Sequence, residues 1–171
     1  MVVWLIGISG AGKTTLGNKL NDYFFLQGIS SFVLDGDLVR NFFDNDLGYS
    51  KDERIANIMR IMLSAKVLEQ NNIIPIVCNI SPFEHLRDFA RFKFEDYNEI
   101  FLKKDIAIAK NLDEKGVYKK NINQTELVGL DIEFEEPKKS NLILNVDQET
   151  EIESFKKIIS YLKDKKNALQ T

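Results

Sequence analysis

The chain has 171 residues, which is enough for one domain with a full hydrophobic core, and 29% of them are charged. The formal net charge of −3 argues against a nucleic-acid partner held by bulk electrostatic attraction. One cysteine rules out an intrachain disulfide, and no apolar run approaches the length of a membrane span. Since Met1 leads straight into an apolar segment, we also expect no cleavable signal. These features predict a cytoplasmic single domain over 1–171, with neither nucleic acid nor membrane as a partner.

Apolar, β-favouring segments alternate with segments of helical periodicity along the chain. The predicted strands cover 2–6, 31–34, 73–78, 97–102 and 142–146. The predicted helices cover 13–27, 38–43, 50–71, 84–95, 106–111 and 150–162, with a fraying tail beyond the last. This alternation predicts an α/β fold, a parallel five-stranded sheet with helices on both faces. In such a sheet, ligands bind at the carboxyl ends of the strands.

A glycine-rich turn directly follows the first predicted strand. Residues 7–14 read Gly-Ile-Ser-Gly-Ala-Gly-Lys-Thr, the pattern of a phosphate-binding loop. Glycines let successive backbone N–H groups point at phosphate oxygens, and the helix N-terminus adds partial positive charge. Lys13 can reach the β- and γ-phosphates of ATP, and the Thr14 hydroxyl can ligate Mg²⁺. The predicted ATP-binding residues are Gly7, Ser9, Gly10, Ala11, Gly12, Lys13, Thr14 and Thr15.

Two carboxylates follow the second predicted strand. Asp35 and Asp37 stand two residues apart across Gly36, where an Asp can ligate Mg²⁺ or accept the proton of an attacking hydroxyl. An Asp-Gly-Asp sequence is also good turn chemistry by itself. The segment 81–83 follows the third strand in the same way. The topology therefore places both segments in one crevice with the phosphate loop.

Five arginines fall in the segments that border this crevice. They are Arg40, Arg54, Arg60, Arg87 and Arg91. In an acidic protein such a group suggests an anionic second substrate held by forked hydrogen bonds, although solvated helix faces show the same spacing. Tyr49, beside a glycine in a nearby loop, is the aromatic side chain that best suits stacking on a base.

The segment 113–136 is long, polar and glycine-containing. It is typical of a mobile lid that closes over substrates and excludes water, or of an ordinary surface loop. Its lysines, among them Lys115, favour the lid. The only histidine, His85, is expected on the surface, and Cys78 in the core.

Taken in order, these segments resemble adenylyl-sulfate kinase. The motifs that carry the resemblance are 7–16, 34–37 with Val39 and Arg40, 46–50, 80–83 with Arg87 and Arg91, and 115–120. The resemblance implies a P-loop kinase fold, a homodimer, and transfer of the γ-phosphoryl of Mg·ATP to the ribose 3′-hydroxyl of a nucleotide. It also implies that Arg40, Arg54 and Asn57 hold the substrate and that Asp37 meets the metal and the hydroxyl.

The predicted site follows from the motifs and the resemblance together. The catalytic residues are Lys13, Asp37 and Asp35, and the metal ligands are Thr14 and Asp37. The residues expected to bind the acceptor are Asp37, Arg40, Tyr49, Arg54, Asn57, Ile80, Ser81, Arg87, Lys115 and Leu127. The cofactor is Mg²⁺ with ATP, and the partner is a small nucleotide acceptor.

Several positions depart from the family's pattern. Leu38, Met59, Glu84 and Leu112 replace an asparagine and three arginines of the family. Leu127 and Val128 replace a phenylalanine and a threonine, and that phenylalanine stacks on the substrate adenine opposite the aromatic that matches Tyr49. Stacking contributes about 1–3 kcal/mol per base, so its loss weakens adenine binding or marks a pocket for another base.

The departures cluster where the acceptor binds, and they suggest a related branch of the family as the leading hypothesis. That branch phosphorylates the 3′-hydroxyl of cytidine diphosphoramidate for capsular polysaccharide biosynthesis. A pyrimidine needs less stacking area, and an uncharged amide needs fewer arginines than a sulfate. The alternative is a true adenylyl-sulfate kinase with a tolerant pocket. A third reading is a regulator that binds the triphosphate without kinase activity, although the chain has no guanine-reading Asn-Lys-x-Asp motif.

Overall fold

The computed structural model describes residues 1–112 and 127–168. Five parallel strands form one sheet in the order β2-β3-β1-β4-β5. The strands are β1 (Val2–Ile6), β2 (Ser31–Asp35), β3 (Ile74–Cys78), β4 (Tyr97–Lys103) and β5 (Leu142–Asn145). The helices are α1 (Lys13–Leu26), α2 (Gly36–Phe42), α3 (Lys51–Gln70), α4 (Glu84–Lys93), α5 (Ile106–Leu112) and α7 (Glu151–Ala168). The predicted α/β architecture with a five-stranded parallel sheet is confirmed.

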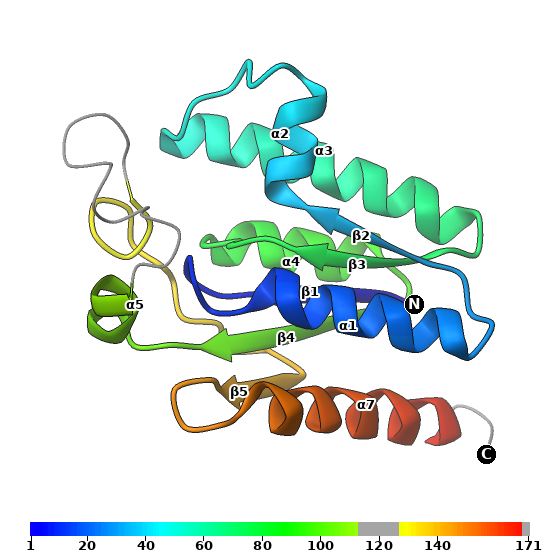
Figure 1. Ribbon diagram of the computed structural model, residues 1–171. Helices are drawn as coiled ribbons and strands as arrows, with labels where there is room; N and C mark the ends of the chain where they lie inside the picture. Colours follow the sequence, from blue (N-terminus) through cyan, green and yellow to red (C-terminus); the bar gives the residue numbers. More distant parts are fainter. Residues whose placement is uncertain (113–126, 169–171) are drawn as a thin grey trace.

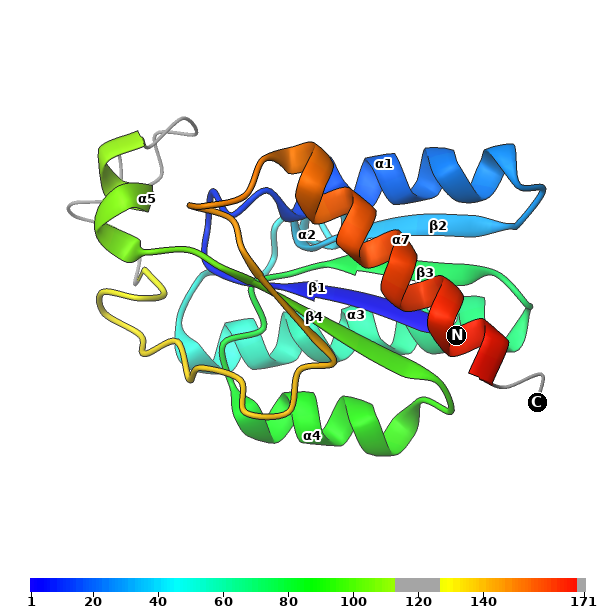
Figure 2. The same ribbon diagram turned by 90° about the horizontal axis from the view of Figure 1, so that it is seen from below.

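Helices cover both faces of the sheet, as Figures 1 and 2 show: α1 and α7 lie on one face, and α3 and α4 on the other. The buried strand β1 explains why two layers form. Trp4 and its alternate neighbours pack against α3 and α4, whereas Leu5 belongs to the cluster under α1 and α7. A strand that is apolar at every position therefore builds a core on each of its faces.

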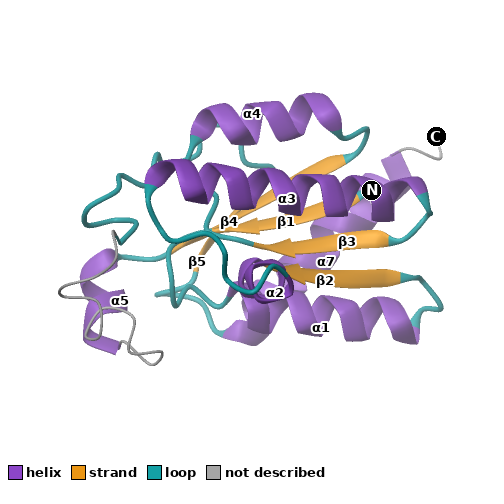
Figure 3. Ribbon diagram, turned by 90° about the horizontal axis from the view of Figure 1, so that it is seen from above, coloured by secondary structure: helices purple, strands orange, loops and turns teal. Residues whose placement is uncertain are grey.

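The carboxyl ends of three neighbouring strands lie level with one another. Leu5 pairs with Cys78, and Cys78 pairs with Asp35, so β1, β3 and β2 end at the same edge of the sheet. In the view of Figure 3, α2 lies beside β2. This edge brings together the segments that follow each strand, and it is where the candidate site forms.

Local signals set several element boundaries. The α3 helix starts with the predicted capping box between Ser50 and Glu53. Helix α2 begins at Gly36, two residues earlier than predicted, because Asp35 caps it by accepting a hydrogen bond from the Asp37 amide. The predicted end of the last helix at 162 is wrong, because α7 continues to Ala168.

None of the helices in the two described ranges combines the length and the apolar character that crossing a membrane requires.

Candidate active site

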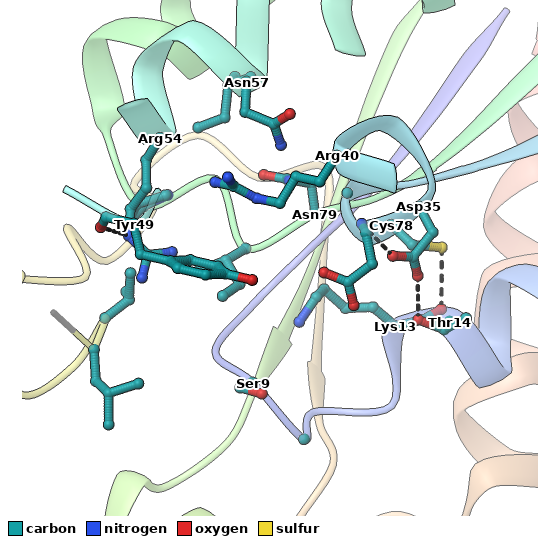
Figure 4. A pocket seen from close by; sticks show the side chains of 18 of the residues that line it. Ser9, Lys13, Thr14, Asp35, Arg40, Tyr49, Arg54, Asn57, Cys78 and Asn79 are labelled. Atoms are coloured by element: carbon teal, nitrogen blue, oxygen red, sulfur yellow. Dashed lines mark hydrogen bonds between the residues drawn. The ribbon is translucent and has the colours of Figure 1, made fainter. Parts of the chain in front are cut away.

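A cavity of about 360 Å³ opens at the carboxyl ends of β1, β2 and β3. Most of the predicted site residues line it. They are Ser9, Gly10, Gly12, Lys13, Thr14, Thr15, Asp35, Asp37, Arg40, Tyr49, Arg54, Asn57, Ile80 and Leu127. Figure 4 shows two groups: Lys13, Thr14 and Asp35 lie on one side, and Tyr49 and Arg54 lie on the other. Segments separated by more than 100 residues therefore meet in one hollow.

The phosphate loop has the backbone that its glycines predict. Gly7 adopts a φ of 145°, and a Cβ there would lie 2.5 Å from the Leu102 carbonyl oxygen, so only glycine fits. Gly12 caps α1 in the left-handed region with a φ of 87°. The Lys13 ammonium donates hydrogen bonds to the carbonyl oxygens of Gly7 and Ile8, each at 2.8 Å. The loop thus holds its lysine at the mouth of the anion-binding turn.

Gly7 and Ala11 support this loop without lining the cavity. Gly7 supplies one of the carbonyl groups that Lys13 contacts, and Ala11 is buried in the core under α1.

Asp35 joins the phosphate loop to α2. Its Oδ2 accepts a hydrogen bond from the Thr14 hydroxyl at 2.6 Å, and its Oδ1 accepts one from the Asp37 backbone amide at 2.9 Å. The Asp37 side chain lines the cavity from the first turn of α2. One hydroxyl and two carboxylates therefore lie beside the loop, and oxygen atoms are the ligands that Mg²⁺ prefers.

This arrangement fits a magnesium ion that is held mainly by nucleotide phosphates. In the described part of the chain, no three His, Cys, Asp or Glu residues cluster closely enough to hold a metal. Mg²⁺ ordinarily needs one or two carboxylates together with substrate phosphates and water. The Thr14 hydroxyl and the carboxylates of Asp35 and Asp37 meet that need.

Two arginines converge on Tyr49 across the cavity. The guanidinium carbon of Arg40 lies 4.5 Å from the centre of the Tyr49 ring, and that of Arg54 lies 5.2 Å from it. Arg40 also donates to the carbonyl oxygens of Leu47 and Gly48 at 2.8 and 2.7 Å. Arg54 donates through Nε to the Tyr49 carbonyl at 2.7 Å. Backbone and ring contacts thus hold two cations beside an aromatic face.

Asn57 reaches the cavity from α3. Its side chain is almost completely buried, and its Oδ1 forms no hydrogen bond with the described residues. A buried amide without a full set of partners is costly, so a ligand in the cavity is the natural source of the missing contact.

The other three arginines do not line the cavity. Arg87 is 1% exposed and donates to the carbonyl oxygens of Ser81 at 2.7 Å and Glu135 at 2.6 Å. Arg60 forms a bidentate ion pair with Asp46. The placement of Arg87 and Arg60 corrects the expectation that they gather at the crevice, because internal partners already occupy both guanidinium groups.

Arg91 belongs to another part of the molecule. It pairs with the fully buried Glu99 at 2.6 Å and with Asp88 at 2.8 Å, near the start of β4 and away from the cavity. The helical spacing of Arg87 and Arg91 therefore reflects packing of α4 against the sheet.

Ser81 anchors the loop after β3 and does not line the cavity. Its hydroxyl accepts a hydrogen bond from the Trp4 indole at 2.9 Å, and the residue is 2% exposed with a φ of 49°. This burial argues against a direct side-chain contact between Ser81 and the acceptor. Lys115, the remaining predicted acceptor residue, lies outside the described residues, as does most of the expected lid at 113–136.

The described end of that segment closes one wall of the cavity. Leu127 lines the cavity, and Val128 also lines it while packing into the core. Tyr49 is the only aromatic residue among the described residues that line the cavity. No described ring therefore faces Tyr49 from the Leu127 side.

Sequence reasoning missed several cavity residues, chief among them Asn79. It directly follows β3 and lines the cavity, but a single asparagine after a strand carries no motif. Cys78 is buried in the core, as expected, and it also lines the cavity. The Cys78 thiol donates to the Lys13 carbonyl oxygen at 3.3 Å, and burial raises the pKa of the thiol to about 12. The Cys78 thiol is therefore expected to be unreactive.

Comparisons with known proteins agree on one family. The family model "Adenylylsulphate kinase" matches residues 1–145. The chain is 38% identical over 168 residues to an adenylyl-sulfate kinase of Bacillus pumilus, covering 96% of this chain and 85% of that protein.

Solved structures give the same result. The Mycobacterium tuberculosis adenylyl-sulfate (APS) kinase, solved in complex with AMPPNP and APS, matches with a TM-score of 0.88 and 30% identity, covering 95% of this chain and 96% of that chain. A hexameric APS kinase of Thiobacillus denitrificans matches with a TM-score of 0.72 and 25% identity, covering 96% of this chain and 29% of that longer chain.

Proposed function

Because the chain belongs to the adenylyl-sulfate kinase family, we propose that it transfers the γ-phosphoryl group of ATP to the ribose 3′-hydroxyl of adenylyl sulfate. Membership of this family makes the protein a phosphotransferase that acts on a nucleotide. One observation carries the proposal for this chain: a single cavity joins the phosphate loop to Asp37, Tyr49 and the two arginines on the far side.

The donor side of the cavity positions ATP. The loop amides and the N-terminus of α1 bind the β- and γ-phosphates, and Lys13 moves from the carbonyl groups of its own loop to the phosphate oxygens. Thr14 and Asp35, which are hydrogen-bonded to each other, would hold Mg²⁺ beside these phosphates, with Asp37 as a further carboxylate. When bound by these residues, Mg²⁺ would supply positive charge to offset the negative charge that develops on the transferred group.

The acceptor side orients the attacking hydroxyl. Asp37 projects from the first turn of α2 into the cavity, where its carboxylate can orient the 3′-hydroxyl and accept its proton. Arg40 and Arg54 bind the anionic phosphosulfate, and Tyr49 offers its ring to the adenine. Catalysis then rests on positioning and charge neutralisation, without a covalent enzyme intermediate.

A second candidate acceptor is cytidine diphosphoramidate. The observation that favours it is Leu127, which lines the cavity without a described ring opposite Tyr49. The comparisons name adenylyl-sulfate kinases, so they favour adenylyl sulfate over the cytidine compound that the sequence departures suggested. The same relatives argue against the reading of the chain as a regulator without kinase activity.

A coupled assay for ADP release tests the choice of acceptor. The protein receives Mg·ATP with adenylyl sulfate in one reaction and cytidine diphosphoramidate in another. We expect a higher kcat/KM with adenylyl sulfate. A strong preference for the cytidine compound would overturn our choice of acceptor and indicate that the Leu127 wall is shaped for a pyrimidine. ADP release that neither acceptor stimulates would overturn the proposed kinase function.

The expected homodimer stays a prediction. The resemblance suggests two subunits, while one structural relative is described as hexameric. Light scattering of the purified protein at several concentrations gives its mass directly, and we expect twice the chain mass of 19.7 kDa.

A further inference from the structure

Asn79 stands at the exit of β3, between two segments of the site. Its Oδ1 accepts hydrogen bonds from the Ser81 backbone amide at 2.9 Å and from the Ser81 hydroxyl at 3.1 Å. Ser81 is in turn fixed by Trp4, whose indole donates to the same hydroxyl. The Asn79 side chain is therefore held in one place by a buried anchor.

This anchor also fixes which way the amide points. A backbone N–H can only donate, so the atom of Asn79 that faces the Ser81 amide has to be the oxygen. The two ends of an amide are otherwise hard to tell apart, but here a hydrogen-bond partner decides between them. The Nδ2 group consequently points away from Ser81, with two N–H donors.

Nδ2 lies against the start of α2. A Cβ placed on Gly36 would lie 2.6 Å from Nδ2, so the amide approaches the backbone between Asp35 and Asp37. Asn79 lines the cavity, and Figure 4 shows it beside Arg40. Nδ2 forms no hydrogen bond with any of the described residues, although Oδ1 of the same side chain forms two. The cavity thus holds a preorganised neutral donor without a protein partner.

We propose that Asn79 is an acceptor-binding residue whose Nδ2 donates a hydrogen bond to a neutral oxygen or nitrogen atom of the acceptor's ribose or base. The proposal rests on the proposed function, and it adds a contact to the acceptor subsite that neither the motifs nor the resemblance indicated.

The charges around Nδ2 explain why the contacted atom is neutral. Asp35 and Asp37 flank the glycine against which Nδ2 lies, and their negative charge disfavours an anion there. The anionic part of the acceptor has stronger partners in Arg40 and Arg54. A ribose oxygen or a base atom remains, and the nearby Asp37 makes this the part of the cavity where the 3′-hydroxyl has to react.

Two substitutions of Asn79 test the Nδ2 donor separately from the hydrogen bonds that Oδ1 accepts from Ser81. Asn79→Asp keeps an oxygen for both Ser81 hydrogen bonds and replaces the donor, whereas Asn79→Ala removes the anchor and the donor without adding charge. Asn21→Asp is the matched control, because Asn21 likewise accepts a hydrogen bond from a serine, Ser31, at 2.9 Å, and neither residue lines the cavity. All three are compared with the unaltered protein for kcat/KM of each acceptor, KM of ATP and the thermal midpoint.

We expect both Asn79 variants to lose about threefold to tenfold or more in kcat/KM for the acceptor, as for one lost hydrogen bond. The KM of ATP should stay within about twofold, and Asn79→Ala, which adds no charge beside Asp35 and Asp37, should still unfold in one cooperative thermal transition. An equal loss with adenylyl sulfate and cytidine diphosphoramidate indicates a ribose contact, and a loss with only one indicates a base contact. Asn21→Asp should change none of these values.

The proposal is overturned if both Asn79 variants keep acceptor kcat/KM within about twofold. It is also overturned if acceptor and ATP parameters fall together with the thermal midpoint, since Asn79 would then only hold the loop. Should the unaltered protein phosphorylate neither acceptor, the proposed function fails separately. Calorimetric titration with each acceptor then tests Asn79 directly, and equal affinities in variant and unaltered protein would refute its role.

Discussion

The two halves of the cavity are built in different ways. The phosphate-binding half is made of backbone: Gly7 and Gly12 adopt conformations that favour glycine, and we propose that the loop amides bind the phosphates. The acceptor half is made of side chains from distant segments, namely Arg40, Tyr49 and Arg54 on one wall and Leu127 on another. A backbone site constrains a short sequence pattern tightly, whereas a side-chain site can change its ligand through single substitutions. Among the positions that depart from the family's pattern, Leu127 and Val128 line the cavity, whereas Leu38, Met59 and Glu84 do not.

The largest expected effect lies in the phosphate-binding half. Lys13→Ala should lower kcat by about two to three orders of magnitude, as the loss of one preorganised charge does at other phosphoryl and oxyanion sites. Lys19→Ala is the matched control on the same helix, because Lys19 pairs on the surface with Glu151. Steady-state kinetics with circular dichroism checks both variants. If a folded Lys13→Ala protein kept near-normal turnover, Lys13 would not have the proposed role in binding the phosphates.

Substitutions in the acceptor half should mainly change the KM of the acceptor. Arg54→Met is expected to raise the KM of adenylyl sulfate by about tenfold to a hundredfold, because a charge-assisted hydrogen bond to the anion is lost. Its control is Arg60→Met, since Arg60 pairs with Asp46 outside the cavity. Initial-rate measurements over a range of acceptor concentrations decide the outcome. If the two variants have the same KM, Arg54 does not belong to the acceptor half.

A smaller change should sharpen the contrast between candidate acceptors. Leu127→Phe places a ring on the wall facing Tyr49 and should improve kcat/KM for adenylyl sulfate several-fold, since base stacking contributes about 1–3 kcal/mol. The gain should be less for the cytidine compound, whose base has a smaller face. Leu130→Phe, at a residue nearby that does not line this cavity, serves as the control. Without a gain from Leu127→Phe, residue 127 contributes packing alone.

The sequence alone was sufficient to predict the architecture and the position of the phosphate-binding half of the cavity. Local signals such as the apolar run of β1 and the Ser50–Glu53 capping box depend on neighbours in the chain, so they can be read directly. Arg54 and Arg87 show the limit of this approach. Both are arginines on helices that border the crevice, yet one reaches Tyr49 and the other is buried against Ser81 and Glu135.

Asn79 was missed, and Ser81 was wrongly placed at the acceptor site, for the same physical reason. Their roles come from a left-handed turn at Ser81 and from the distant Trp4 indole, 77 residues away along the chain. No local pattern encodes such a contact. The side-chain half of a site therefore becomes visible only when the packing of separate segments is known.

The smallest expected effect concerns the ionisation of the Cys78 thiol. Burial raises the pKa of the Cys78 thiol to about 12, so the folded state keeps the thiol protonated at pH 8.5. Because the folded pKa lies above the unfolded value, stability should fall as the pH rises past the unfolded value of about 8.5. Iodoacetamide should modify the native protein at least about a hundredfold more slowly than the urea-unfolded protein. Equal rates would show that Cys78 is accessible and ionised.

The transfer of the phosphoryl group itself is the most direct test of the account. The protein is incubated with ATP labelled at the γ-phosphate, Mg²⁺ and adenylyl sulfate, and the products are separated and examined by phosphorus NMR. We predict one labelled phosphate on the ribose 3′-oxygen for each ADP formed, and no transfer by Asp37→Asn protein. Label that appears only as inorganic phosphate, or on another atom of the acceptor, would contradict the assignment of this cavity as a nucleotide 3′-kinase site.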